Sequence, residues 1–284
     1  METPAENHRL TNYHSHTPYC DGRCDMEEFV ATAVWLGFAS YGISPHSPLP
    51  LPSGCNMKRE RVADFIEEME RLKRKYGRRI ELYTGMEIDF IGDEWGPSND
   101  FFASLPLDYR IGAVHFLRCD DGGFAEIDCS AATFKEIADN RFGGNIRRLV
   151  ERYFAAMLDM IERGGFDFAA HPDKISMNAS AYSPGITEEK WYSELLHAYF
   201  ERIAATGTML EVNTKAYSRT GFLFPNRKWF AELKRLGIEL TVNSDAHIPA
   251  LMTCGFDDTK RFLREAGYDH VMQLKGGVWR ENPL

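Results

Sequence analysis

Nine side chains of the types that bind divalent metals recur in this sequence beside short β-rich runs. Histidines or carboxylates end or follow six of these runs, in the segments HSH, PHS, GMEID, AVHF, AAHPD and NSDAH. Imidazole and carboxylate groups without thiolate suit Zn²⁺, Mn²⁺ or Fe²⁺. We therefore predict a metal site built from His14, His16, Asp21, His46, Glu87, His115, His171, Asp245 and His247.

The spacing within two of these segments supports binding to a common ion. Residues i and i+2 of extended backbone point to the same side, so His14 and His16 can bind one ion side by side, as can Asp245 and His247. A single histidine at a strand end is more often structural, but six of the nine histidines fall at such positions together with Glu87. We expect no metal contact from the other three histidines, His8, His197 and His270.

The β-rich runs alternate with amphipathic segments, which implies parallel strands joined by right-handed crossovers. About seven strand–helix units fit a closed or nearly closed α/β barrel, and an open doubly wound sheet is the alternative. In a barrel the carboxyl ends of the strands share one face, where active sites are built, so the nine side chains should meet there. The predicted strands are Leu10–His14, Ala39–Ile43, Ile80–Glu87, Tyr109–His115, Phe166–Ala170, Thr208–Asn213 and Ile238–Val242.

The helices between the strands show apolar stripes and recognisable ends. From Arg59 to Tyr76 apolar residues recur at helical spacing, and Gly77 can end this helix. Asp25 can cap a helix that runs to Leu36. The remaining predictions are helices over 147–163, 188–205 and 228–236, and long surface loops over 91–106 and 120–144 with a helical turn at 134–140.

Composition narrows the class of protein. The 284 residues suit one large domain, expected to span 1–284, and the net charge of −9 argues against a nucleic-acid partner. The sequence contains no apolar run of about 18 residues, so no membrane span is expected. The beginning of the chain lacks the apolar core of a secretory signal, and the six cysteines contain no CxxC pair. We therefore expect reduced thiols in a cytoplasmic protein, whose oligomeric state the sequence does not reveal.

The ordered set of motifs resembles the polymerase-and-histidinol-phosphatase (PHP) superfamily. HSHTPYCDG, GMEIDF, GAVHF, HPD and NSDAH occur in the order of that family, and the resemblance extends from Tyr13 to about Gly267. Within the superfamily the chain looks closest to histidinol-phosphate phosphatases, through the segments HTPYC, LDYRIGAVHF, EVNTKAYSRTGFLFPN and GFDD.

This resemblance implies a distorted (β/α)₇ barrel, similar to the TIM barrel, that holds two to three divalent ions (Zn, Mn or Fe). The first ion would be held by His14, His16, Glu87 and Asp245. Glu87 would also bridge to a second ion, completed by His115 and His171. The third ion would be held by Asp21, His46 and His247.

One position departs from the pattern of the phosphatase branch. Many histidinol-phosphate phosphatases carry a histidine one place after the position of Asp21, where this chain has Gly22. Other PHP proteins carry Asp in a CDG or SDG sequence, as here. We therefore expect a third metal site that is intact but altered.

The implied reaction is hydrolysis of L-histidinol phosphate, a small-molecule phosphate ester, in histidine biosynthesis. A hydroxide that bridges two metals is a strong nucleophile at neutral pH and would attack phosphorus in line. Arg219 is the main candidate for binding the phosphate, because guanidinium matches phosphate in two-pronged geometry. Further candidates for substrate binding are Lys174, Lys215 and Asn213. The proton for the leaving alcohol could come from Asp245, His247 or metal-bound water.

Other functions remain open at this point. Another PHP phosphoesterase would share the metal ligands and act on a different small phosphate ester, a nucleotide or a phosphotyrosine. A non-catalytic, metal-stabilised module should instead have a closed, cysteine-rich site. A metal-dependent amidohydrolase shares the barrel and the HxH segment, but no lysine is placed to bridge its metals. Polymerase-linked proofreading is disfavoured because the chain is acidic and has no polymerase region.

Overall fold

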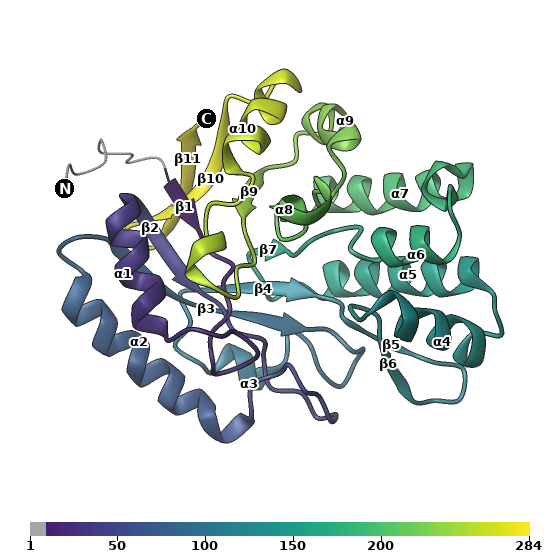
Figure 1. Cartoon of the computed structure of the whole chain (residues 1–284), viewed down its shortest axis with the longest axis horizontal. Coiled ribbons are helices and arrows are strands. Elements are labelled where there is room, and N and C mark those ends of the chain that lie inside the picture. Colours follow the sequence, from purple (N-terminus) through teal and green to yellow (C-terminus); the bar gives the residue numbers. More distant parts are fainter. Residues whose placement is uncertain (1–9) are drawn as a thin grey trace.

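Seven parallel strands form one sheet in this computed structural model, which describes residues 10–284. The strand order is β1-β2-β3-β4-β7-β8-β9, and neighbouring strands are linked by segments that contain helices (Figure 1). Each strand falls within or overlaps one predicted run, so the prediction of parallel strands is confirmed. The strands are β1 (Leu10–Asn12), β2 (Phe38–Ile43), β3 (Glu81–Asp89), β4 (Tyr109–Ala113), β7 (Phe168–Ala169), β8 (Met209–Asn213) and β9 (Leu240–Asn243).

The two edge strands of this sheet, β1 and β9, meet at their carboxyl ends. Ser15 and Ala246 form a parallel bridge, and the backbone N–H of His16 donates to the carbonyl oxygen of Ala246 at 2.9 Å. The backbone N–H of Tyr13 also donates to Asn243 Oδ1 at 2.8 Å. The sheet is therefore nearly closed into a barrel, and the alternative of an open doubly wound sheet is wrong.

Helices cover the outside of the barrel and begin and end for local reasons. Glu28 Oε1 accepts a hydrogen bond from the backbone of Asp25, and Gly37 ends the first helix in a left-handed conformation with φ of 77°. The long helix predicted after Arg59 starts as one turn of 3₁₀ helix. Six of these helices are α1 (Met26–Leu36), α2 (Val62–Tyr76), α5 (Ile146–Arg163), α7 (Lys190–Thr206), α9 (Phe230–Arg235) and α10 (Phe256–Glu265).

The prediction of a long loop over 120–144 is wrong. This region contains part of an antiparallel hairpin, β5 (Phe116–Arg118) and β6 (Phe124–Glu126), and a helix, α4 (Ala131–Arg141), in place of a single turn. Ser130 caps α4 by accepting from the backbone of Thr133, and Phe134 is fully buried. The segment 91–106 is mostly irregular but includes the short helix α3 (Asp100–Ala103). Two further short helices are α6 (Ile175–Tyr182) and α8 (Tyr217–Thr220).

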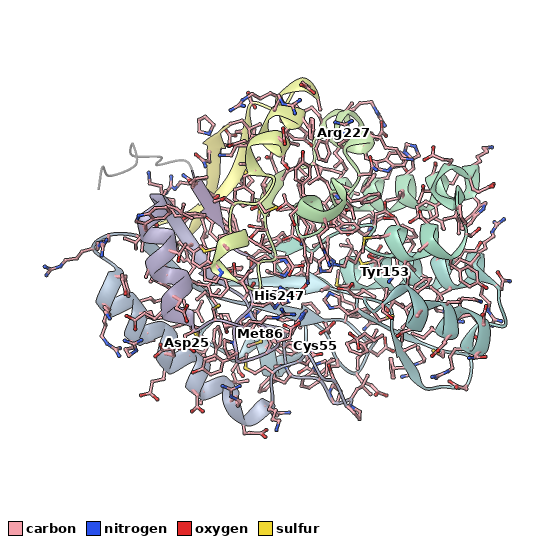
Figure 2. All side chains as sticks on the ribbon, viewed as in Figure 1. Asp25, Cys55, Met86, Tyr153, Arg227 and His247 are labelled. Atoms are coloured by element: carbon pink, nitrogen blue, oxygen red, sulfur yellow. The ribbon has the colours of Figure 1, made fainter. Side chains whose placement is uncertain are left out.

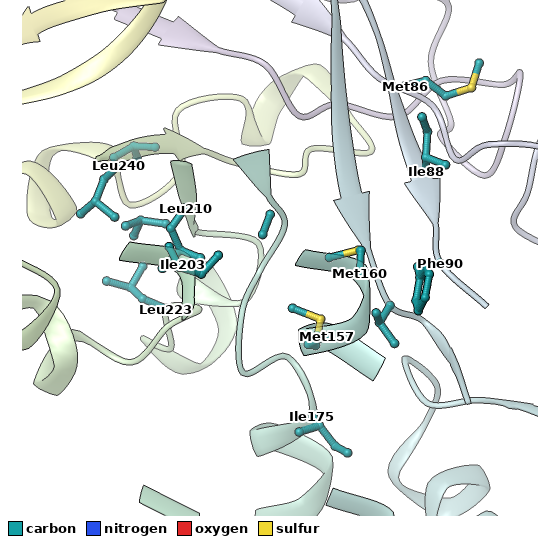
Figure 3. Close-up of a cluster of buried hydrophobic side chains, with 14 of the residues drawn as sticks. Met86, Ile88, Phe90, Met157, Met160, Ile175, Ile203, Leu210, Leu223 and Leu240 are labelled. Carbon is teal, nitrogen blue, oxygen red and sulfur yellow. The ribbon is translucent and has the colours of Figure 1, made fainter. Parts of the chain in front are cut away.

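The main hydrophobic core lies between the barrel and its helices. Met157 and Met160 of α5 share a buried cluster with Ile88 of β3 and with Phe90, which follows that strand (Figure 3). Protein interiors are close-packed, so these contacts fix the strands that carry the predicted ligands. Among residues 10–284 no helix is long and apolar enough to cross a membrane.

A second cluster fills the amino end of the barrel, and a C-terminal hairpin covers it. The hairpin consists of β10 (His270–Lys275) and β11 (Val278–Pro283), which the sequence did not predict as strands. Its Trp279 ring lies 5.2 Å from the ring of Tyr13. A Cβ atom on Gly85 would lie 2.1 Å from Tyr109 Cζ, so glycine is needed there for Tyr109 to enter the barrel. The barrel is therefore sealed at its amino end.

Candidate metal centre

All nine predicted ligands lie at the carboxyl end of the barrel, and five of them, Asp21, His46, His115, Asp245 and His247, line one cavity. His14 and His16 follow β1, Glu87 lies in β3, and Asp245 and His247 follow β9. The cavity has a volume of about 940 Å³. Figure 2 shows His247 near the middle of the molecule, where the carboxyl ends of the strands converge. The fold thus brings together residues that are up to 233 positions apart in the sequence (His14 to His247).

Glu87 lies at the centre of the predicted ligands and contacts histidines through both carboxylate oxygens. Glu87 Oε2 is 3.2 Å from His14 Nε2 and 2.8 Å from His46 Nδ1. Glu87 Oε1 is 2.8 Å from His171 Nε2 and 3.5 Å from His115 Nε2. A carboxylate with histidines on both oxygens has the arrangement expected of a ligand that bridges two ions.

A second group forms where the segment after β1 meets the segment after β9. Asp21 Oδ2 is 3.2 Å from His247 Nε2, and Asp21 Oδ1 is 3.9 Å from His46 Nε2. His16 faces this group through Nδ1 and faces Asp245 through Nε2, which lies 3.0 Å from Asp245 Oδ1. The three residues predicted for a third ion are therefore adjacent, with His16 beside them.

The departure at Gly22 has a steric cause in this chain. A Cβ atom at position 22 would lie 2.3 Å from the backbone of His16 and Thr17, a distance that no side chain can accept. A histidine here would require a different path for the loop. The loop instead presents Asp21 to the cavity.

Unpartnered buried atoms test whether cations fit this site. Buried polar atoms in proteins are nearly always hydrogen-bonded. Seven ligand atoms of the predicted set are buried and make no hydrogen bond of acceptable geometry, although several lie close to another charged or polar group, as Glu87 Oε2 does to His46 Nδ1 and Asp245 Oδ1 does to Lys215 Nζ. Ligand atoms of the nine residues also form groups whose members lie within 4.8 Å of one another. Divalent ions would satisfy them, so the residues fit the predicted metals. These atoms are His14 Nε2, His16 Nε2, Asp21 Oδ1, His46 Nδ1, Glu87 Oε2, His171 Nδ1 and Asp245 Oδ1.

The electrostatics of the site also favour bound cations. Burial by itself would lower the pKa of His14, but the carboxylates of Glu211 and Glu87 raise it well above its usual value. Burial and the neighbouring imidazoles hold the pKa of His16 well below its usual value, which favours the neutral imidazole that a metal would need. Burial opposes ionisation of Glu87, yet the surrounding histidines hold its pKa well below the usual range. The centre is thus built around ionised carboxylate that needs positive charge beside it.

Two predicted ligands have strained backbone. The φ angle is 49° at Asp245 and 24° at His171, in a region that residues other than glycine rarely adopt. The backbone N–H of His171 is held by Glu211 Oε2 at 2.8 Å. Strain of this kind concentrates at functional sites, where the surrounding structure fixes it.

Two buried carboxylates that sequence reasoning missed hold the outer nitrogens of ligand histidines. Glu211 Oε1 lies 2.7 Å from His14 Nδ1, and Asp89 Oδ1 lies 2.7 Å from His115 Nδ1. Such partners fix the orientation of an imidazole and increase its basicity toward a metal. The signal was present in the sequence, since Asp89 follows Glu87 by two residues on the same strand and Glu211 is an acid in the buried strand β8.

The predicted phosphate-binding residues have different surroundings. Arg219, on α8, is exposed, lines the cavity and makes no ion pair within residues 10–284. Lys215 Nζ is 3.2 Å from Asp245 Oδ1, and buried Lys174 Nζ is 3.2 Å from Asp128 Oδ2. Asn213 is buried and does not line the cavity, and its Nδ2 donates to Glu211 Oε2 and to Asp245 Oδ2.

The remaining histidines lie away from the centre where the structure describes them. His197 on α7 is 3.4 Å from Glu232, and His270 on β10 is 2.9 Å from Glu239. The third, His8, lies outside the described residues. Both described histidines have surface carboxylate partners and no part in the nine-residue set.

Comparisons with known proteins agree with this arrangement. Residues 12–215 match the family model of the PHP domain. Histidinol-phosphatase of Bacillus subtilis (strain 168) is 27% identical over 253 residues, which cover 82% of this chain and 92% of that protein.

Two solved structures share the fold. Histidinol phosphate phosphatase (HISK) from Lactococcus lactis subsp. lactis Il1403, complexed with zinc, L-histidinol and phosphate, has a TM-score of 0.70 at 19% identity and covers 96% of this chain and 99% of its own. The hisK protein of Listeria monocytogenes has a TM-score of 0.78 at 22% identity and covers 88% of this chain and 99% of its own. The predicted fold is therefore confirmed.

Proposed function

The chain belongs to the PHP domain family, and on that premise we propose that it is a metal-dependent phosphatase that hydrolyses L-histidinol phosphate to L-histidinol and phosphate in histidine biosynthesis. One observation carries this proposal. Seven buried imidazole and carboxylate atoms without a hydrogen bond gather at one end of the barrel, beside a cavity that is lined by Asp21, His46 and Asp245 and also by Lys174, Lys215 and Arg219. Cation sites beside basic side chains suit a doubly charged phosphate group.

This geometry supports the proposed metal ligands. Two to three divalent ions, Zn²⁺, Mn²⁺ or Fe²⁺, would lie between Glu87 and its histidines and between Asp21, His46 and His247. When bound, such ions lower the pKa of water and neutralise charge on the phosphoryl group. Glu211 and Asp89 keep His14 and His115 oriented for this task.

The basic residues of the cavity would bind and orient the phosphate. Lys215 lies beside Asp245, so its ammonium is held next to the predicted ions, where phosphoryl oxygens would be placed. Arg219, free of other partners within the described chain, can turn toward the phosphate and bind it through two N–H groups. His247, whose side chain is one-fifth exposed, lies at the cavity wall and can deliver a proton to the leaving alcohol. Asp245 could do so only after taking a proton from the attacking water.

The protein's setting is part of the proposal. The six cysteines, all within the described residues, are free thiols, which supports a reducing compartment such as the cytoplasm. The whole of 1–284 would act as one domain on a small-molecule ester, with no nucleic-acid partner.

Hydrolysis of L-histidinol phosphate by the purified protein with added Mn²⁺ or Zn²⁺ tests this function. We expect turnover that chelation abolishes and that His14→Ala loses. A nucleotide monophosphate and phosphotyrosine serve as competing substrates. Turnover of L-histidinol phosphate no faster than that of the His14→Ala variant would rule out the assignment, and faster turnover of either competitor would favour another phosphoesterase activity.

A further inference from the structure

The β5–β6 hairpin places two carboxylates in the cavity wall that are not predicted metal ligands. Glu126 ends β6, and Asp128 follows two residues later, so both can face the cavity that they line. The backbone N–H of Ile127, between them, donates to the carbonyl oxygen of His115 at 2.8 Å. The position of Glu126 is therefore fixed relative to a residue of the metal centre.

These two carboxylates differ in their partners. Asp128 is paired with Lys174, and its pKa is low because the charges of Lys174 and Lys215 outweigh the effect of burial. Glu126 has no basic side chain within ion-pair distance in the described part of the chain. The thiol of Cys55 is its polar neighbour, with Sγ 3.9 Å from Glu126 Oε1.

The other cavity carboxylates are also paired. Asp21 contacts His247, and Asp245 contacts Lys215. Burial raises the pKa of Glu126, and although His115 opposes this effect, the nearby charge of Asp128 adds to it. A half-buried carboxylate without a cation is unfavourable, and a positively charged group of a ligand would remove that cost.

The cavity therefore has two chemically different parts. Lys174, Lys215 and Arg219 supply positive charge for a phosphate, whereas Glu126 supplies negative charge that no protein cation neutralises. Small side chains, among them Cys129 and Ala131, also line the cavity. A cavity of about 940 Å³ can hold a small ester across both parts.

We propose that Glu126 binds a positively charged group on the alcohol part of the substrate, so that the site selects phosphate monoesters of cationic amino alcohols over those of neutral alcohols. The inference rests on the proposed phosphatase function and names the substrate class that this site prefers. In L-histidinol phosphate the ammonium or the imidazolium would donate to the Glu126 carboxylate in a charge-assisted hydrogen bond.

Substrate preference in Glu126→Gln tests the proposal. The quantity measured is the ratio of kcat/KM for L-histidinol phosphate to kcat/KM for p-nitrophenyl phosphate, whose alcohol is neutral. We expect this ratio to fall about 10- to 100-fold, through KM for L-histidinol phosphate, because a hydrogen bond to a charged group is lost. Bound metal should remain as in the wild type, and Glu126→Asp should restore part of the ratio.

A matched control is Glu136→Gln on α4, an exposed carboxylate that does not line the cavity. It should keep the wild-type ratio. An unchanged ratio in Glu126→Gln, or equal losses on both esters, would overturn the proposal.

The failure of the proposed function gives a different result. If the wild type hydrolyses p-nitrophenyl phosphate but not L-histidinol phosphate, the same ratio is measured with O-phosphoethanolamine as the cationic ester. A fall of that ratio in Glu126→Gln would support cation recognition without the histidinol assignment. A wild-type preference for the neutral ester would overturn cation recognition itself.

Discussion

The two ends of the barrel use the same strands for opposite purposes. At the amino end, Tyr13, Tyr83 and Tyr109 pack under the C-terminal hairpin, and each hydroxyl has a hydrogen-bond partner within the protein. At the carboxyl end, a layer of histidines and acids is equally buried, but many of its atoms have no partner. Strand β3 contributes to both ends of the barrel, because Tyr83 lies near its start and Glu87 near its end.

This difference separates residues that stabilise the fold from residues that await a ligand. Trp279 Nε1 donates to Asp167 at 2.9 Å, so even the indole that closes the amino end is satisfied. Polar groups that are buried and unsatisfied cost stability. Seven of the seventeen such side-chain atoms among the described residues belong to the predicted ligands, which gather at the carboxyl end. Substitutions at the carboxyl end should therefore change metal content and activity, whereas substitutions at the amino end should change the free energy of unfolding.

The largest effect is expected at the carboxyl end of β3. Glu87→Ala removes the carboxylate that contacts histidines on both sides, and we expect loss of bound metal and a fall in kcat of about 10³-fold or more, since metals contribute several kcal/mol to such reactions. Glu81→Gln, at the amino end of the same strand, is the control and should keep metal and activity. Both variants are compared with the wild type by metal content and kcat. An active, metal-loaded Glu87→Ala would show that the metal centre does not depend on Glu87.

A smaller effect is expected one layer behind the ligands. Glu211→Gln weakens the hold on His14 Nδ1, and we expect metal affinity or activity to fall about 10- to 100-fold. Titration of metal into metal-free protein measures the change. Exposed Glu201→Gln on α7 should have no effect. Equal metal affinity in Glu211→Gln and the wild type would mean that Glu211 serves only the fold.

At the amino end, the expected change is in stability alone. Trp279→Ala removes a partly buried ring that packs on Tyr13 and should lower the free energy of unfolding by about 2 kcal/mol without changing kcat. Trp35 is 65% exposed, and Trp35→Ala should change stability by less than about 0.5 kcal/mol. Denaturant unfolding gives both values. A large loss of kcat in a folded Trp279→Ala would show that the two ends are coupled.

The smallest effect is expected on the surface, away from both ends. Hydrogen bonds from Lys75, Arg71 and Tyr76 lower the pKa of Glu27 to about 2 from its usual 4.5. A carboxylate with a lowered folded-state pKa stabilises the protein above pH 4.5, and this stability is lost as the pH falls toward 2. Glu27→Gln should therefore be slightly less stable than the wild type at pH 7, with a smaller difference at pH 4 and in high salt. A difference that grows as the pH falls would contradict this assignment.

The sequence predicted the carboxyl end of the barrel better than the amino end. Ligand residues have distinctive types and follow buried strands, so His115 and Asp245 could be assigned to one face without coordinates. The aromatic cluster at the amino end could not be predicted, because Tyr13 and Trp279 are far apart in sequence and such residues are common in proteins. The C-terminal hairpin has charged and apolar residues mixed along both strands, which gives no clear period.

Within the site, the sequence predicted residues but not their partners. Asn213 was expected to contact substrate, yet its amide bonds to Glu211 and Asp245. Glu126 lay in a segment predicted to be a loop, and its lack of a cationic partner depends on which side chains the folded hairpin faces. Which side chains become partners depends on tertiary contacts, whereas the residue types that can bind a metal are visible in the sequence.

The central claim is that side chains converging at the carboxyl end of the barrel bind the cations that make this protein a phosphatase. Anomalous X-ray scattering from crystals of the active protein, recorded at the absorption edge of its metal, tests this most directly. We predict two or three peaks, about 2.0–2.3 Å from atoms of Glu87 and its histidines and from the Asp21, His46 and His247 group. Active crystals without a peak in this cavity, or with metal only elsewhere, would contradict the claim.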